Sequence, residues 1–163
     1  MAEGEPVEVT VRDVSDTDVE VFFEDQQDPE AAQMAAMATR DREAFFAHWA
    51  RIRANETGTT ATVVADGRVA GHVLSWEAEG RRWVGSWIGR PFWGLGIATR
   101  ALGLVVEQVR QRPLYAHVAT HNRGSIRVLE KCGFRPVGAA VVGADGVEEL
   151  TYVLEAERRR GAD

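Results

Sequence analysis

Residues Arg90–Thr99 read RPFWGLGIAT, the end of a strand that passes through a glycine-bearing turn into a helix. Gly94 and Gly96 carry no Cβ, so another molecule can approach the backbone closely at this turn. The first N–H groups of the following helix have no acceptor inside the helix, and the positive end of the helix dipole favours an anion. The pattern therefore indicates a phosphate-binding turn, although two glycines can also serve only to close a tight loop.

The segments on either side of this turn predict two parallel strands. Arg82–Gly89 has the pattern of a strand, residues 94–110 carry apolar side chains at helical spacing, and Leu114–Ala119 has the pattern of a short buried strand. Pro113 ends the helix. Because a strand, a crossover helix and a second strand in one sheet pair in parallel, we expect one parallel pair in this sheet.

The rest of the chain predicts an antiparallel sheet with further helices. Asp66-Gly67 and Asp145-Gly146 tolerate the positive φ of tight hairpin turns, and Glu77–Arg81 is predicted as another turn. We expect one α+β domain over residues 1–156 and a frayed, charged tail over residues 157–163. The other predicted elements are a strand at 7–11, helices that open at Ser15 and at Asp28-Pro29, a helix over Arg42–Ala54, strands over Thr59–Ala65 and Arg68–Trp76, a helix over Asn122–Lys131, and a hairpin of Phe134–Val142 and Val147–Leu154.

Charge is distributed unevenly along the chain of 163 residues, which has a formal net charge of -6. Residues 1–30 contain 11 acidic residues and one basic residue, whereas residues 81–135 contain ten basic and two acidic ones, a local net charge of +8. A cationic region inside an acidic protein favours a small phosphate-bearing ligand over a nucleic acid. The alternative is that these arginines only solvate two helices.

The single cysteine and the hydropathy pattern bear on location. Cys132 is alone, so no internal disulfide can form, and the sequence lacks the Cys/His spacing of a zinc site. The longest apolar runs are far shorter than the roughly 20 residues that cross a bilayer. We therefore expect a cytoplasmic protein with no metal site and no membrane partner.

A second motif follows the parallel unit, because Ala119–Phe134 reads ATHNRGSIRVLEKCGF. Together the two motifs resemble the Gcn5-related N-acetyltransferase (GNAT) superfamily, whose acetyl-CoA loop reads Q/R-x-x-G-x-G/A. Here the match is Trp93–Ala98, with Trp93 in place of the usual Gln or Arg. A Trp-Gly opening followed by an N-x-x-S helix is similar to the branch that includes the ribosomal-protein-alanine N-acetyltransferases.

The resemblance implies a fold and a cofactor. The fold is a three-layer α/β/α domain with a mixed, mostly antiparallel sheet of six or seven strands, in which the parallel pair splays at the cofactor site. The cofactor is acetyl-CoA, with its pyrophosphate on the backbone N–H groups from Gly94 to Thr99. The residues expected to contact it are Trp87, Ile88, Gly89, Trp93, Gly94, Leu95, Gly96, Ile97, Ala98, Thr99, Asn122, Ser125 and Arg127; Asn122 is also a good helix cap, and Arg123 is an alternative phosphate contact.

Catalysis is less well defined by the sequence. Many members of the family protonate the leaving sulfur with a tyrosine, and Leu129 stands at that position. Ser125 is our candidate for a hydrogen bond to the sulfur, while Glu77 and His72 are the first candidates for the base that takes a proton from the amine. The other possible bases are Glu30, Glu79, His117, His121 and a bound water.

These observations predict an acetyl-CoA-dependent N-acetyltransferase that transfers the acetyl group directly to a primary amine. The amine belongs either to a small molecule or to a protein N-terminus, and the acidic first helices favour a cationic one. A homodimer is possible. The alternative is a catalytically silent module that binds or senses acyl-CoA, which the missing tyrosine favours.

Overall fold

The computed structural model of the chain describes residues 6–35, 40–143 and 146–156. The seven strands form one sheet in the order β1-β2-β3-β4-β5-β7-β6. The strands are β1 (Val9–Arg12), β2 (Thr59–Ala65), β3 (Arg68–Ala78), β4 (Arg81–Ile88), β5 (Leu114–Ala119), β6 (Arg135–Val142) and β7 (Glu148–Leu154). The helices are α1 (Asp16–Gln26), α2 (Pro29–Met34), α3 (Arg42–Ala54), α4 (Ile97–Gln108) and α5 (Arg123–Lys131), with a 3₁₀ turn η1 (Arg90–Phe92).

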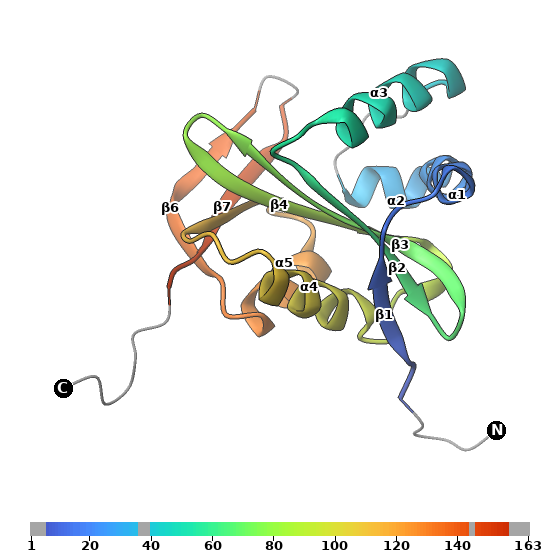
Figure 1. Cartoon of the computed structure of the whole chain (residues 1–163). Coiled ribbons are helices and arrows are strands. Elements are labelled where there is room, and N and C mark those ends of the chain that lie inside the picture. The colour runs from blue at the N-terminus through green and yellow to red at the C-terminus, as the bar shows by residue number, and fades with distance from the viewer. Residues whose placement is uncertain (1–5, 36–39, 144–145, 157–163) are drawn as a thin grey trace.

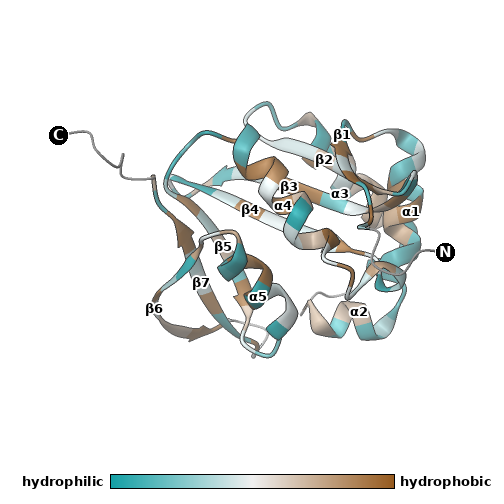
Figure 2. Cartoon of the chain, turned by 90° about the horizontal axis from the view of Figure 1, so that it is seen from below, coloured by the Kyte–Doolittle hydropathy of each residue, from teal (hydrophilic) through white to brown (hydrophobic). Residues whose placement is uncertain are grey.

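The helices lie on both faces of the sheet. Figure 1 shows α1, α2 and α3 on one side and α4 and α5 on the other. In Figure 2 α4 and α5 lie in front of the sheet, and α4 has apolar stretches along its length. Phe22 and Trp49 belong to the apolar cluster beneath α1 and α3, while Ile97 and Leu102 of α4 belong to the larger core on the opposite face. The three-layer α+β fold expected from the sequence is therefore confirmed.

The parallel pair of β4 and β5 opens along its length. The two strands are paired only at Arg82 with Leu114 and at Trp83 with Tyr115. Beyond these positions β5 continues its antiparallel pairing with β7, whereas β4 pairs only with β3. The edge of β4 that faces β5 is therefore unpaired from Val84 onward, and the expected splay is confirmed.

The structure corrects two predicted boundaries. The helix after the glycine turn begins at Ile97 rather than at residue 94, because Gly94 and Gly96 have φ of 78° and 75° and cannot belong to a right-handed helix. The hairpin between β3 and β4 turns only at Glu79 and Gly80, which both have positive φ, so Glu77 lies on a strand rather than in a turn.

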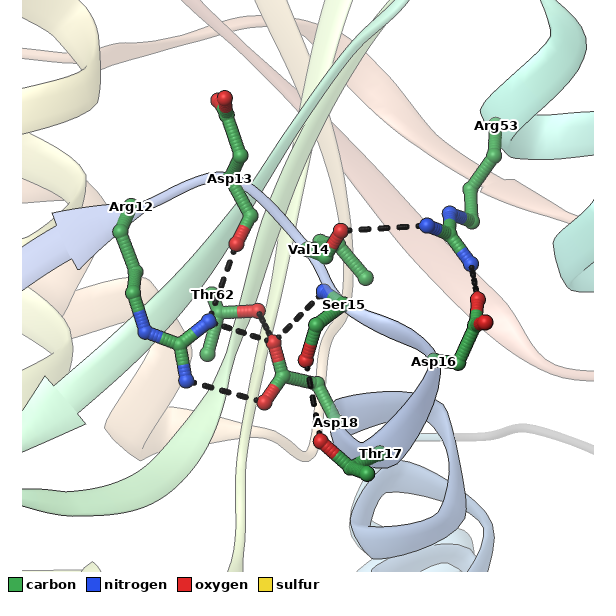
Figure 3. A network of polar contacts seen from close by, with 9 residues as sticks. All are labelled: Arg12, Asp13, Val14, Ser15, Asp16, Thr17, Asp18, Arg53 and Thr62. Atoms are coloured by element: carbon green, nitrogen blue, oxygen red, sulfur yellow. Dashed lines mark hydrogen bonds and ion pairs between the residues drawn. The ribbon is translucent and has the colours of Figure 1, made fainter.

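A buried carboxylate fixes the start of α1 to the sheet, as Figure 3 shows. Asp18 is 2% exposed and accepts hydrogen bonds from the Arg12 guanidinium at 2.7 and 3.0 Å, from the Ser15 N–H at 2.9 Å and from the Thr62 hydroxyl at 2.7 Å. Burial alone would raise the pKa of Asp18, but these hydrogen bonds outweigh burial and hold the pKa well below its usual range. Asp18 is therefore a charged but fully partnered group.

Two further findings concern the described residues alone. No helix in them is long and apolar enough to span a membrane. Their His, Cys, Asp and Glu side chains form no group of three or more that could hold a metal ion. The predicted tail over residues 157–163 and position 145 of the last hairpin lie outside the described residues.

Candidate active site

The glycine turn presents a row of unused backbone donors. Gly96 is the N-cap of α4 in the left-handed conformation, and no side chain caps the helix. Within the described structure, the N–H groups of residues 94–99 have no hydrogen-bond acceptor, and the first helical bond runs from the Arg100 N–H to the Gly96 carbonyl at 3.2 Å. An uncapped helix N-terminus of this kind binds anions, and phosphate in particular.

Trp93 explains how the turn is held without the usual Gln or Arg. Its indole N–H donates to the Ile88 carbonyl at 2.7 Å, which ties the turn to the last residue of β4. The Gly89 N–H donates to the Ala70 carbonyl of β3 at 2.8 Å. The residues at the end of β4 are therefore hydrogen-bonded both to β3 and to the glycine turn. The turn therefore has a defined position relative to the unpaired edge of β4.

A cavity of about 430 Å³ opens beside this turn. It lies between α2, the end of β4, the start of α4, and α5. Most of the predicted cofactor residues line it, but Gly89 and Leu95 do not, and Leu95 is 52% exposed. The lining residues are Ala31, Met34, Ala35, Ser86, Trp87, Ile88, Phe92, Trp93, Gly94, Gly96, Ile97, Ala98, Thr99, Asn122, Gly124, Ser125, Arg127, Val128 and Lys131.

Helix α5 contributes polar and cationic groups to the cavity. The Asn122 side chain caps the helix by accepting from the Ser125 N–H at 3.2 Å, so the capping role is real, and both residues also line the cavity. Arg127 and Lys131 are exposed along the same helix and form no ion pair within the described part of the chain. Two cations without an ion pair among the described residues thus line the same cavity as the uncapped turn, where they complement a polyphosphate.

The residue at the tyrosine position belongs to the core. Leu129 is 7% exposed and packs in the cluster beneath α4 and α5. Ser125 is half-buried in the cavity wall. Of the two residues considered for the leaving sulfur, only Ser125 therefore has a polar group at the cavity.

The two first candidates for the base lie away from the cavity lining. Glu77 lies in a second cavity, beside Arg82 at 3.9 Å. The His72 ring packs against Phe22 and Trp49, with centroid distances of 4.7 and 4.8 Å, and burial lowers its pKa to about 3. An imidazole in this environment stays neutral at physiological pH.

Three of the four other candidate bases contact residues of the described structure, and the fourth lines the second cavity. Glu30 pairs with Arg90 at 2.5 Å, and Glu79 lies in the second cavity. His117 stacks on Trp83 with a centroid distance of 4.2 Å. His121 contacts the Gln33 carbonyl at 3.0 Å through Nε2, which links α2 to the loop before α5.

From the sequence, Met34 of α2 is open to two interpretations, lining a pocket or packing in the core, and Ala31, Ala35 and Lys131 are not predicted to line the site. Ala31, Met34 and Ala35 line the cavity, and α2 is positioned by Asp28, whose side chain accepts from the Glu30 and Ala31 N–H groups. Lys131 lies two helical turns after Gly124 on the same side of α5, a spacing that could have indicated its position.

The fold and this cavity define a class of proteins. In this class, a parallel strand pair splays and leaves room for a phosphate-bearing ligand. The model of the acetyltransferase (GNAT) domain family matches residues 8–135, and the chain belongs to this family. An uncharacterized N-acetyltransferase of Schizosaccharomyces pombe is 31% identical over 77 residues. That match spans 45% of this chain and 41% of the yeast protein, so the chain covers less than half of that relative's length.

Solved structures share the fold at low sequence identity. RimL, a ribosomal α-N-protein acetyltransferase in complex with coenzyme A, has a TM-score of 0.77 at 14% identity, over 90% of this chain and 93% of its own. Spermidine N-acetyltransferase from Vibrio cholerae, in complex with CoA and spermine, has the same TM-score and identity, over 90% of this chain and 95% of its own. The family expected from the two motifs is therefore confirmed, and a ribosomal-protein acetyltransferase is among its structural neighbours.

Proposed function

We propose that this protein is an acetyl-CoA-dependent N-acetyltransferase that transfers the acetyl group directly to a primary amine. The observation that carries the proposal is the row of N–H groups at residues 94–99, which have no acceptor in the described structure and border a cavity beside the splayed strands. Membership of the GNAT family supports it. Acetyl-CoA supplies an activated thioester, so the protein's task is to hold two reactants in line.

The residues of the cavity fit such a ligand. The uncapped turn and the unpaired Arg127 and Lys131 would hold its phosphates. Trp87, Ile88 and Phe92 offer an apolar wall for the pantetheine arm. Ser125, which lines the cavity, would donate a hydrogen bond to the leaving sulfur, so Ser125→Ala should lower kcat without changing the affinity for acetyl-CoA.

We propose a cationic amine as the acceptor. Residues 1–30, which include α1 and the start of α2, contain 11 acidic residues and one basic one. Part of this charge lies next to the cavity wall, because Asp28 and Glu30 flank the start of α2 and share one cation, Arg90. A net negative charge near a site raises the local concentration of a cationic substrate, an effect that salt weakens.

The test is release of free thiol from acetyl-CoA in the presence of amines. The panel contains spermidine, kanamycin, free amino acids, and peptides that differ in their first residue. We expect thiol release that depends on the amine and that is faster for cationic than for neutral amines at low salt. Equal rates for the two kinds of amine would contradict the acceptor proposal alone.

The second candidate function is a silent acyl-CoA-binding module, favoured by the burial of Leu129 where many relatives have a tyrosine. Both candidates predict that CoA raises the melting temperature. Only the enzyme releases thiol when amines are offered. Stabilisation by CoA without thiol release from any amine would therefore establish the silent module and overturn the enzyme.

A further inference from the structure

Four buried polar side-chain atoms have no hydrogen-bond partner within the described residues. They are Asp25 Oδ2, Gln26 Nε2, His72 Nδ1 and Trp87 Nε1. Buried polar groups are almost always hydrogen-bonded, since an unmade bond costs free energy. A group of such atoms in one part of a protein points to a ligand or solvent that completes them.

The four residues come from the end of α1 and from the strands β3 and β4. His72 and Trp87 are direct partners in the β3–β4 pair, so their side chains project from the same face of the sheet. The His72 ring contacts Phe22 of α1, and Gln26 follows Phe22 by one helical turn. Trp87 is 9% exposed and also lines the cavity, so this part of the protein adjoins the proposed acetyl-CoA site.

Asp25 lies directly over the end of β4. A Cβ built on Gly89 would lie 2.9 Å from Oδ2 of Asp25, so a larger residue at this position would displace the carboxylate. Gly89 follows Trp87 by two residues, and the two positions therefore face the same side of the strand. The carboxylate thus borders the strand that we expect to carry the pantetheine arm.

Among the residues that the structure describes, no cation forms an ion pair with this carboxylate. Arg90, the first cation after β4, pairs instead with Asp28 at 3.5 Å and with Glu30 at 2.5 Å. Burial, together with the neighbouring charge of Glu24, raises the pKa of Asp25 to about 6. The charged and titratable groups of the elements around Asp25 are, on α1, Asp16, Asp18, Glu20 and Glu24; at the start of α2, Asp28 and Glu30; on β3, Arg68, His72 and Glu77; and, on and just after β4, Arg81, Arg82 and Arg90.

We propose that Asp25 receives the ammonium group of the acceptor and accepts its proton, an inference that rests on the proposed function. The ammonium gives one proton to the carboxylate, and the amine nitrogen then forms a bond to the thioester carbon. As the carbon–sulfur bond breaks, the sulfur takes the second proton that the nitrogen loses. Asp25 returns its proton to solvent, so the products are the amide, the free thiol and one proton.

Asp25, like Glu77 and His72, is not among the residues that line the cavity, but it adjoins Gly89 just after β4, next to the lining residue Ile88. Glu77 lies in a different cavity, and the His72 ring is enclosed by Phe22 and Trp49. A carboxylate without a cation attracts an ammonium group, and a base that titrates near neutral pH suits proton transfer from an amine.

The test compares Asp25→Asn with Glu24→Gln in the full chain. Asn has the size of Asp but cannot take a proton, and Glu24 is an exposed carboxylate on the same helix. For the best acceptor of the panel, we expect kcat/KM of Asp25→Asn at pH 7 to fall by about 100-fold or more, the usual contribution of a general base. The Kd for acetyl-CoA should stay within about twofold, and Glu24→Gln should keep most of the activity.

The pH profile separates a proton acceptor from a merely structural residue. Wild-type kcat/KM should rise tenfold per pH unit below about pH 6, the pKa raised by burial of Asp25, and level off above it. In Asp25→Asn it should keep rising to pH 9, since only the free amine reacts. A variant that retains both the rate and the inflection near pH 6 would overturn the proposal.

A binding measurement keeps the inference separate from the proposed function. Spermidine titrated calorimetrically into the CoA complex should bind Asp25→Asn at least about tenfold more weakly than wild type, as expected for the loss of a charged contact. If no amine releases thiol but this difference appears, the proposed function fails and the acceptor contact of Asp25 stands. Equal affinities would overturn that contact.

Discussion

Each end of α1 carries an aspartate, Asp18 fully buried and Asp25 half-buried, and the pKa values of the two carboxyls are shifted in opposite directions. Asp18 in the first turn accepts hydrogen bonds from Arg12, Ser15 and Thr62, and its pKa lies well below the usual range. Asp25 in the last turn has one oxygen with no hydrogen-bond partner among the described residues, and burial raises its pKa to about 6.

This difference distinguishes the carboxylate of Asp18, which stabilises the fold, from the carboxylate of Asp25, which we expect to contact a ligand. A buried charge with a full set of donors stabilises the folded state, whereas a buried charge without them destabilises it. Such destabilisation persists where a function requires it. The comparison therefore assigns Asp18 to the fold and Asp25 to the site.

The largest expected effect on stability comes from Asp18→Asn. The amide would turn a donor toward Arg12 or Thr62, and we expect a loss of about 3 kcal/mol at pH 7 in urea-induced unfolding. Because the pKa of Asp18 is lowered in the folded state, its contribution is complete above the unfolded pKa of about 4 and declines as the pH falls below it. The difference between variant and wild type should therefore shrink at pH 3; a constant difference would contradict this assignment.

Asp25→Asn should act in the opposite direction. A carboxyl whose pKa is raised to about 6 destabilises the fold once ionised by at most about 3 kcal/mol, and its partial contact with solvent reduces this to about 1 to 2 kcal/mol. The folded state binds the proton more tightly, so wild-type stability falls between about pH 4 and pH 6 and stays low above that range. We expect the variant to be more stable than wild type at pH 8 and equal to it at pH 3.5, measured by urea unfolding. A loss of stability at pH 8 would show that Asp25 supports the fold.

The smallest effect is expected for Thr62→Val, which removes one donor to Asp18 and keeps the side-chain shape. We expect a loss of about 1 kcal/mol, since Arg12 and Ser15 still hold the carboxylate. In the Asp18→Asn background the same change should cost much less, because the two residues act through one hydrogen bond. Additive losses would mean that Thr62 stabilises the protein by packing alone.

Local signals predicted most of the fold. Proline and aspartate at the start of α2, the Asp66-Gly67 turn and the apolar periodicity of α3 each act within a few residues, so the sequence expresses them directly. The start of α4 was predicted at Gly94, although the apolar side chains at helical spacing begin only at Ala98, and the left-handed backbone of Gly94 and Gly96 excludes both from the helix. Periodicity is a property of side chains, and it does not report φ.

The candidate site likewise has one part that the sequence reveals and another part that it does not. The cofactor turn depends on the backbone of neighbouring residues, and its glycines identify it in the sequence. Asp25 acquires its properties from Gly89, 64 residues further along the chain, and no spacing in the sequence reveals that contact. The raised pKa and the missing partner are consequences of tertiary packing, which explains why sequence reasoning favoured Glu77 and His72 instead.

The most direct test of the central claim is a calorimetric titration of acetyl-CoA into wild type, Gly96→Val and Gly80→Val. Gly96 and Gly80 have nearly the same φ, 75° and 74°, and a Cβ at either position would meet nothing within 4 Å, so the two substitutions impose matched backbone strain. If the N–H groups of the turn hold the diphosphate, Gly96→Val should weaken binding by about 30-fold or more, roughly 2 kcal/mol, while Gly80→Val binds like wild type. Equal affinities of wild type and both variants would contradict the account.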